Sequence, residues 1–479
     1  MGAWRMRKLI ALAATAALAG CNFAPKFVQP AAPIAPAFSA GATDGRQAAE
    51  IGWREFFGDA RLQTLIATAL ANNRDLAQSV ARVAQARAQF GIQDAERLPQ
   101  VDVVAGASRS RQPSNAGGFP PTGGGPPPSG SFTFDQFSLG AQVASFELDF
   151  WGRVRNLSEA QRREFLATVE AERAFRLSLV GQVAATYLQI RAGEEQIALA
   201  ERSVTGRREG VRLARLRERA GVTSTVDLDQ ATLLVTQAET ELAELRRTVA
   251  QSENLLTVLV GGPIAAPLPA PRALSDPGQY AAVAPGLPSD LLLNRPDILA
   301  AEQRLRAANA NIGVARASFL PRISLTGLLG FISPALGGLL SGDALQYRAG
   351  VDAAQPILTW GTGRQGIALT RAQADELVAA YQRTAQEAFR EVADALVARQ
   401  RYAEQIAAQV RGVDAQRRLA RVARLRYDQG LSIYLEVLDA ERNLFAAEQQ
   451  LLALRSAQLQ SEVALYVALG GGLRETSAG

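Results

Sequence analysis

The chain has 479 residues, of which 48% are apolar and 20% are charged, so it can bury sizeable cores and extensive disorder is not expected. Its formal charge of +5 includes Arg5, Arg7 and Lys8 of a leader; without these three cations it falls to about +2, which gives no electrostatic reason to expect nucleic-acid binding. The chain has no histidine and one cysteine, which excludes an intrachain disulfide, a cysteine-based metal site and serine–histidine catalysis. The composition therefore predicts a protein that is not an enzyme and holds no metal or other cofactor.

Residues 1–20 have the pattern of a lipoprotein signal peptide. A basic start is followed by the apolar run Leu9–Leu18 and then by Leu18-Ala19-Gly20-Cys21, which is the order of a secretory signal with a small-residue cleavage site. The last four residues resemble the bacterial lipobox, which implies cleavage before Cys21 and attachment of a diacylglycerol and an acyl chain to that cysteine. A chance thiol is the alternative. By the same resemblance, Asn22 in place of an aspartate favours the outer membrane.

Residues 21–61 are predicted to form a lipid-anchored tether. Pro25–Gly45 is rich in proline and alanine, a composition typical of an extended spacer. Beyond the leader the sequence has no run of about eighteen apolar residues, so helical membrane spans are not expected. Any membrane crossing must then be made by strands.

The rest of the chain consists of two copies of one internal repeat. Residues 62–262 form the first copy and residues 294–471 the second, with a linker over 263–293 and a tail over 472–479. The correspondence rests on landmark pairs at an offset of 222 (Asp75 with Asp297, Leu98 with Leu320, Pro99 with Pro321) and then of 209 (Trp151 with Trp360, Gly221 with Gly430, Gly261 with Gly470). The difference lies before Trp151, where the first copy carries the Gly- and Pro-rich stretch Gly117–Gly130. Equivalent residues that keep a constant offset along the two copies indicate a duplication.

Each copy is predicted to contain a long helical hairpin. No proline occurs between Pro128 and Pro263 or after Pro356, and both stretches are rich in Ala, Leu, Arg, Glu and Gln, which favour helix. Gly221 and Gly430 end the first arms, and Ser224 with Asp227 indicates a capping box that starts the next helix. The predicted arms are 155–219 with 226–260 and 364–428 with 435–469, and an arm of that length extends roughly 100 Å. Shorter helices over 62–96 and 297–317 precede them.

Two strands are predicted in each copy, at about 100–150 and 322–358. Phe137, Leu139, Ala141 and Val143 alternate with polar or small residues, as in a transmembrane β-barrel with lipid on one side and water on the other. An ordinary half-buried sheet of a soluble domain is the alternative. Four strands cannot enclose a water-filled channel or hide their edges from lipid, so a barrel would have to be shared among several chains.

Two segments, 287–298 (LPSDLLLNRPDI) and 434–442 (YLEVLDAER), together with the lipobox and the duplicated element order, closely resemble the TolC-like outer membrane efflux proteins. Within them the chain is similar to the NodT-type lipoprotein branch that serves resistance-nodulation-division pumps. The resemblance implies a mixed α and β membrane protein in the outer membrane of a Gram-negative bacterium. It also implies a homotrimer with a 12-stranded transmembrane β-barrel, four strands per chain, continuous with a long α-helical coiled-coil barrel. The implied partners are a periplasmic adaptor (membrane fusion) protein and an inner membrane resistance-nodulation-division pump.

Charged residues near the second helical turn are the candidate gate. Leu435, Asp439 and Arg442 share one helix face, with Glu436 beside Asp439. A solvated face is the alternative, but in a trimer three Asp439 carboxylates would form a ring that favours cations, and a bridge to Arg442 could hold neighbouring helices shut. By resemblance, Leu435, Asp439 and Arg442 match the family's gate positions and Asp227 another acidic tip position. The first copy has Gln230 and Leu233 instead of Asp439 and Arg442, which suggests that the second hairpin moves.

The two helical turns are the candidate adaptor-docking sites, with Gly221 and Thr223 in the first and Gly430 and Ser432 in the second. These glycines also simply end helices, and both interpretations can hold together. The predicted function is an outer membrane exit duct of a tripartite efflux pump, gated at its periplasmic tip, for drugs or other small organic solutes. Copper or silver export is not favoured, because Met1 and Met6, the only methionines, lie in the leader.

Two other functions stay open. A protein-secretion duct is disfavoured by the lipobox, and a structural envelope lipoprotein without a pore is disfavoured by the alternating strands in both copies.

Overall fold

The computed structural model describes residues 22–38, 46–113, 130–264, 267–284, 286 and 288–472. The predicted signal peptide, the lipidation site at Cys21, most of the Gly- and Pro-rich stretch and nearly all of the tail lie outside the described residues. The chain divides into two compact units: the first holds residues up to Gln29, Ala84–Leu166 and Gln303–Ala379, and the second holds the rest. Among the helices of the described part, none is apolar enough over a sufficient length to cross a membrane.

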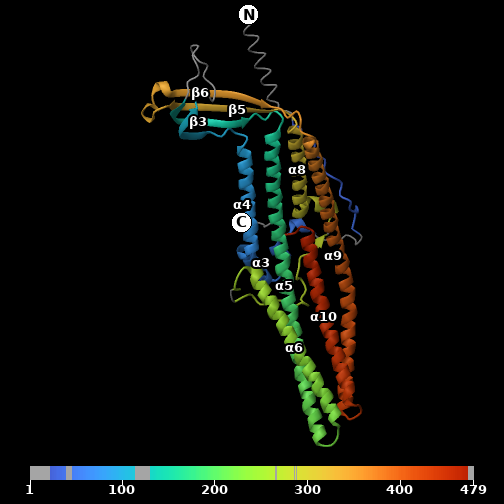
Figure 1. Cartoon of the computed structure of the whole chain (residues 1–479). Helices are drawn as coiled ribbons and strands as arrows, with labels where there is room; N and C mark the ends of the chain where they lie inside the picture. The colour runs from blue at the N-terminus through green and yellow to red at the C-terminus, as the bar shows by residue number, and fades with distance from the viewer. Residues whose placement is uncertain are drawn as a thin grey trace, which may run out of the picture. The chain divides into compact units, whose positions relative to one another are not determined.

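The first unit contains a four-stranded antiparallel sheet in the order β2-β3-β5-β6 (Figure 1). Its strands are β2 (Asp102–Pro113), β3 (Ser131–Glu147), β5 (Arg322–Ser333) and β6 (Leu345–Ala354). The strands lie inside the two predicted β regions, and a bulge between Val143 and Phe146 adds one residue to β3.

The register of this sheet gathers apolar side chains on one face. Ala141 pairs with Val103 on one side and Leu329 on the other, and Leu329 pairs with Tyr347. Because successive residues of a strand point to opposite faces, the alternating pattern of the sequence becomes one apolar face. Val103 is 79% exposed and Tyr347 is 83% exposed. Large apolar side chains therefore remain uncovered within this chain.

The N-terminal segment is extended but is not a free tether. In the first unit, Asn309 on α8 (Pro296–Ala317) donates a hydrogen bond of 2.8 Å to the Pro25 carbonyl, and the Arg306 guanidinium lies 4.3 Å from the centre of the Phe27 ring. A Cβ on Gly313 would lie 2.8 Å from Ala24, so the segment approaches the helix closely. The prediction of a tether is corrected because side chains of α8 hold this segment in place.

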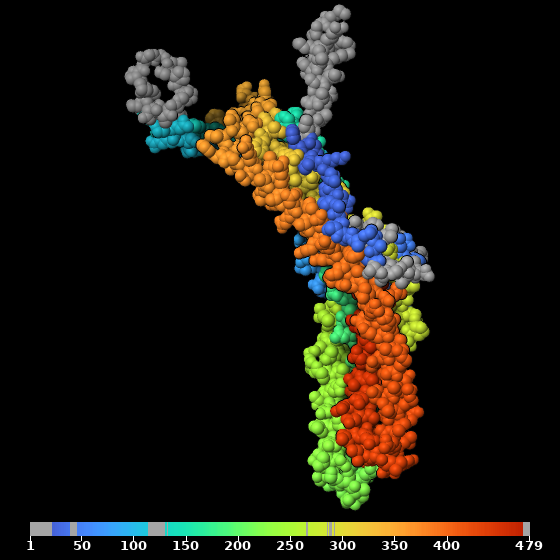
Figure 2. All heavy atoms as spheres, turned by 90° about the vertical axis from the view of Figure 1, so that its right-hand side faces the viewer, coloured from blue at the N-terminus to red at the C-terminus, as the bar shows by residue number. Residues whose placement is uncertain are grey.

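Two long helical hairpins carry most of the remaining chain (Figure 1). The first is α5 (Arg153–Arg219) with α6 (Thr225–Val260), and the second is α9 (Thr362–Asp428) with α10 (Tyr434–Ala468); all ends lie within two residues of those predicted. Gly221 has φ +72° and Gly430 has φ +75°, a backbone conformation that glycine adopts without strain. In the second unit α9 and α10 lie side by side over the length of their hairpin (Figure 2).

Two local predictions about helix starts were wrong. The predicted helix over 62–96 is two helices, α3 (Ala60–Asn72) and α4 (Arg74–Ala95), because the Asn73 side chain accepts a 2.8 Å hydrogen bond from Leu76 N–H and so starts a new helix. The capping box at the start of α6 does not form. The Ser224 side chain makes no cap hydrogen bond, and the Asp227 carboxylate accepts one from the Thr223 hydroxyl instead.

The core of the second unit is built around aromatic rings. Phe56 stacks on Tyr466 with ring centres 3.9 Å apart, and the Tyr466 hydroxyl donates to the Ile51 carbonyl over 2.7 Å. Residues 46–61, predicted as the end of the tether, are therefore part of this core. The short elements around it are β1 (Arg46–Gln47), paired in parallel with β4 (Val283–Ala284), α2 (Trp53–Phe56) and α7 (Pro288–Asn294).

Candidate functional site

The predicted gate residues lie on an exposed face of the first turns of α10. Arg442 Nη2 lies 3.0 Å from Asp439 Oδ1, and the two side chains are 61% and 53% exposed. Leu435 is exposed on the same face. Since Asp439 and Arg442 both belong to α10, this ion pair lies along one helix of the chain, and the bridge between neighbouring helices stays a prediction.

Glu436 makes one of the contacts that join the two arms of the second hairpin at this end. Its Oε2 lies 3.7 Å from Arg426 Nη1 near the end of α9. Asp227, the acidic residue predicted at the first turn, is engaged by Thr223 of that same turn. Glu436 therefore links the two helices of a hairpin, whereas Asp227 makes its contact within a single turn.

The two turns present apolar side chains that the sequence prediction did not single out. Val222 at the first turn and Leu431 and Ile433 at the second are all exposed. The Ser432 hydroxyl, in contrast, is buried and has no hydrogen-bond partner among the described residues, so it does not offer a free polar contact at the surface. A partner that met these turns would contact aliphatic side chains first.

The two hairpins contact each other closely near the start of α10, at a residue that is buried rather than on the exposed face that carries Asp439 and Arg442. The Tyr434 ring at the start of α10 packs on Gly210 of α5, where any Cβ would overlap the tyrosine hydroxyl. Tyr434 also packs against Tyr427 with ring centres 4.9 Å apart, and the Arg217 guanidinium lies 4.1 Å from the Tyr427 ring centre. The only sequence signal was a glycine inside a long helix, which marks a close approach in some cases and nothing in others.

A buried arginine on α5, one helical turn from Gly210, also links the two hairpins. Arg207 is 8% exposed, donates to the Leu234 carbonyl over 3.0 Å and lies 5.5 Å from the Phe445 ring centre. Burial lowers the pKa of the Arg207 guanidinium, against the pull of nearby carboxylates. Burial also raises the pKa of Glu441, against the opposing effect of Arg424 and Arg207. The second hairpin is therefore attached to the first by aromatic packing and by partly buried charges.

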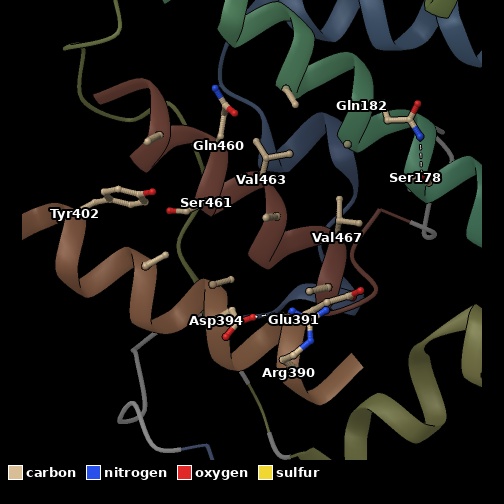
Figure 3. Close-up of a pocket in the computed structure, with 17 residues that line it drawn as sticks. Ser178, Gln182, Arg390, Glu391, Asp394, Tyr402, Gln460, Ser461, Val463 and Val467 are labelled. Carbon is tan, nitrogen blue, oxygen red and sulfur yellow. Dashed lines mark hydrogen bonds and ion pairs between the residues drawn. The ribbon is translucent and has the colours of Figure 1, made fainter. Parts of the chain in front are cut away.

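A groove in the second unit is lined by α5, α9 and α10 (Figure 3). Gln182 donates to the Ser178 hydroxyl over 2.8 Å, and Arg390 pairs with Asp394 at 3.0 Å along α9. Most other lining residues are alanine, glycine and valine. The groove therefore offers a mainly apolar surface, and with no histidine in the chain it offers no serine–histidine pair. In the described part of the chain, no group of three acidic, His or Cys residues is placed to hold a metal ion.

A family model described as outer membrane efflux protein matches residues 65–262 and 287–471. The chain therefore belongs to the outer membrane efflux protein family. It is an outer membrane component of an efflux pump, and a channel protein rather than an enzyme.

Individual relatives agree with this assignment. The toluene efflux pump outer membrane protein TtgC of Pseudomonas putida is 41% identical over 476 residues, which cover 98% of this chain and 96% of that protein. The cation efflux system protein CusC of Escherichia coli is 38% identical over 475 residues, covering 98% and 99%. The open state of the Neisseria gonorrhoeae MtrE outer membrane channel superimposes with a TM-score of 0.84 at 34% identity and covers 95% of this chain and 99% of that one.

Proposed function

We propose that the chain forms a homotrimeric exit duct of a tripartite efflux pump, with an adaptor protein and an inner membrane resistance-nodulation-division pump as partners. The observation that supports this most directly is the open sheet of the first unit. Its apolar face is exposed, and its end strands β2 and β6 each have one edge without a strand among the described residues. Lipid cannot form hydrogen bonds with the unpaired backbone groups of an open strand edge. Three copies would therefore join their four strands each into one closed 12-stranded barrel.

The lipid anchor would sit beside this barrel. Asn22, the residue after Cys21, accepts a 2.9 Å hydrogen bond from Asn156 through its side chain, and the Phe23 ring lies 6.4 Å from the Trp151 ring. Both partners belong to the unit that contains the sheet. A lipid on Cys21 would therefore enter the leaflet next to the strands that cross it.

The helical hairpins would form the periplasmic conduit, with the gate at their turns. Three copies of Asp439 would make an acidic ring at the narrow end, and the second hairpin would open it by moving away from the first. The contact of Tyr434 with Gly210 would be the restraint to overcome. The exposed aliphatic side chains at Val222, Leu431 and Ile433 support docking of the adaptor at both turns.

Drugs or other small organic solutes are the proposed cargo. TtgC is named for toluene and CusC for cations, so family membership alone leaves the cargo open. The mature chain would have neither histidine nor methionine, and thus none of the imidazole or thioether ligands that soft metal ions prefer. Organic solutes need no such ligands in the duct, because the pump would select them.

Dye efflux tests the proposal. Gram-negative cells lacking their own exit duct would receive this chain with the adaptor and pump encoded beside it, and efflux of a fluorescent dye should be restored and be lost again without the adaptor. A correctly inserted trimer that restores no dye efflux would point to another cargo or to protein secretion. Liposomes containing a purified protein that forms no solute leak would point to a structural lipoprotein.

A further inference from the structure

The sheet of the first unit ends in two strands whose outer edges have exposed apolar neighbours. β6 is followed by Ile357, Leu358 and Trp360, and Trp360 is 87% exposed. β2 is preceded by Leu98 and Val101, which are also exposed. An open strand edge with apolar flanks favours pairing with another chain.

Within the chain, β3 pairs with β5 and the residues next to these strand ends contact each other; we call such a paired boundary a joint. This joint shows how the apolar residues that flank a strand edge are covered. Trp151 Nε1 donates to the Pro321 carbonyl over 2.7 Å, and the Leu148 N–H donates to the Ile323 carbonyl over 2.8 Å. Trp151 is only partly exposed as a result. Trp360 is its counterpart in the second copy and has no such cover among the described residues.

We propose that a second copy of this chain supplies the missing cover, so that Trp360 Nε1 donates to the carbonyl of Pro99 of the partner subunit. In the same joint β6 pairs antiparallel with the partner subunit's β2. The inference rests on the proposed trimer and specifies its subunit contact to the residue.

The correspondence between the two copies fixes the register of this joint. Val103 corresponds to Leu325, and Ala141 corresponds to Val351 once the bulge that adds one residue to β3 is allowed for. The observed hairpins obey this correspondence: Val103 pairs with Ala141, and Leu325 pairs with Val351. The two hairpins are thus built in the same register, and the joint between them can be transferred in the same way.

When the observed β3–β5 pairing is applied to β6 and the partner subunit's β2, it gives the contacts across the subunit boundary. Ala141 pairs with Leu329, which places Val351 opposite Ala107 of the partner subunit, with both side chains on the apolar face. The bond from Leu148 to Ile323 places the Ile357 N–H at the carbonyl of Val101 of the partner subunit.

Pro356 agrees with this register and disfavours a shift by one residue. It lies next to Ile357, so it falls at a position of the joint where no hydrogen bond is made, because such positions alternate along an antiparallel pair. A proline has no N–H to donate, and at this position its absence costs the joint nothing. A shift of the register by one residue would place Pro356 where a donor is needed and would turn the apolar side chains to the opposite face.

Cysteine cross-linking in the outer membrane tests the register. Ala354→Cys and Val104→Cys should face each other across the subunit boundary at a position without hydrogen bonds, close enough for a disulfide. Mild oxidation should convert the double variant to covalent dimers and trimers on a non-reducing gel. The matched control pairs Ala354→Cys with Ser108→Cys, four residues and roughly 13 Å further along the strand, and should stay monomeric, as should each single variant.

If the first double variant does not insert, Ser110→Cys with Arg348→Cys reports on the same register near the other end of the strands. Cross-linking of Ala354→Cys to Gly106→Cys in place of Val104→Cys would overturn the register. Trp360→Phe removes the indole donor and should lower the temperature at which the oligomer dissociates in detergent, and an unchanged temperature would overturn the contact with Pro99. A chain that is monomeric in the membrane would instead refute the proposed function, whereas an active trimer joined in another register would refute this inference alone.

Discussion

Arg295 Nη1 donates to the Ala468 carbonyl over 2.8 Å, which fixes the start of α8 to the last turn of α10. The first copy makes the same connection with a different side chain, because Asn73 Nδ2 donates to the Leu259 carbonyl over 2.8 Å before α4. The four residues occupy corresponding positions of the two copies. In each copy the short helix is therefore fixed to the returning arm of its hairpin by one side chain placed just before the helix.

Arg295→Ala should lower the free energy of unfolding by about 2 kcal/mol. The substitution leaves the Ala468 carbonyl without its buried donor, and a buried acceptor without a partner costs about 1 to 3 kcal/mol. It also removes the guanidinium from Glu391 and Asp297, which lie 2.8 and 2.6 Å away but are partly exposed. Thermal unfolding of the purified protein measures the effect. Arg383→Ala, which breaks an exposed pair with Glu387, is the control and should cost under about 1 kcal/mol.

Gly210→Ala should loosen the second hairpin. An added Cβ overlaps the Tyr434 hydroxyl, so the ring has to leave α5. The expected results are a larger single-channel current in a planar bilayer and greater entry of antibiotics into cells. Gly206→Ala is the matched control, because a Cβ there meets nothing within 4 Å, and it should be neutral or stabilise by about 0.5 to 1 kcal/mol. Equal currents for the two variants would rule out the contact as a restraint on the gate.

The long helices and their turns could be predicted because their signals are local. The absence of proline and the positions of Gly221 and Gly430 set the helix ends to within two residues. The break at Asn73 was missed, since helix-favouring residues lie on both sides of it and its carbonyl partner is far along the chain.

Contacts between distant segments could not be predicted from local signals. Phe56 was assigned to a tether because the ring on which it stacks, Tyr466, lies near the end of the chain. At the candidate site the exposed face of Asp439 and Arg442 followed from helical spacing, whereas the packing of Tyr434 on Gly210 depends on how two hairpins meet. Periodicity shows which face of a helix is polar, but not which glycine another helix approaches.

Glu441→Gln should stabilise the protein at pH 7, and the gain should shrink as the pH falls. Burial raises the pKa of Glu441, and the Arg424 guanidinium, 3.6 Å away, offsets only part of that effect. A carboxyl group with a raised folded pKa is harmless below its ordinary pKa of about 4.3 and costs stability as the pH rises through the folded pKa. The difference in unfolding temperature between variant and wild type, measured from pH 4 to pH 8, tests this.

Glu244→Gln is the control for the same measurement. Hydrogen bonding to Arg247 lowers the pKa of this exposed carboxyl, so the variant should gain no stability at neutral pH. A gain for Glu441→Gln that stays constant from pH 4 to pH 8 would show that the charge of Glu441 is not the cause.

Asp439→Ala and Arg442→Ala should each increase the single-channel current of the trimer, although neither should change its unfolding temperature much. The pair is exposed, so its direct contribution is only ~0 to 1 kcal/mol per chain. Three copies around one axis would add, and that is enough to bias a gate that an adaptor opens with its binding energy. Asp439→Ala should also weaken the preference for cations, since it removes the acidic ring, whereas Arg442→Ala should keep it. Asp414→Ala breaks a pair of the same spacing and exposure on α9 and should leave current and selectivity unchanged. If both gate variants conduct like the wild type, the closed state is held elsewhere, and the contact of Tyr434 with Gly210 becomes the first place to look.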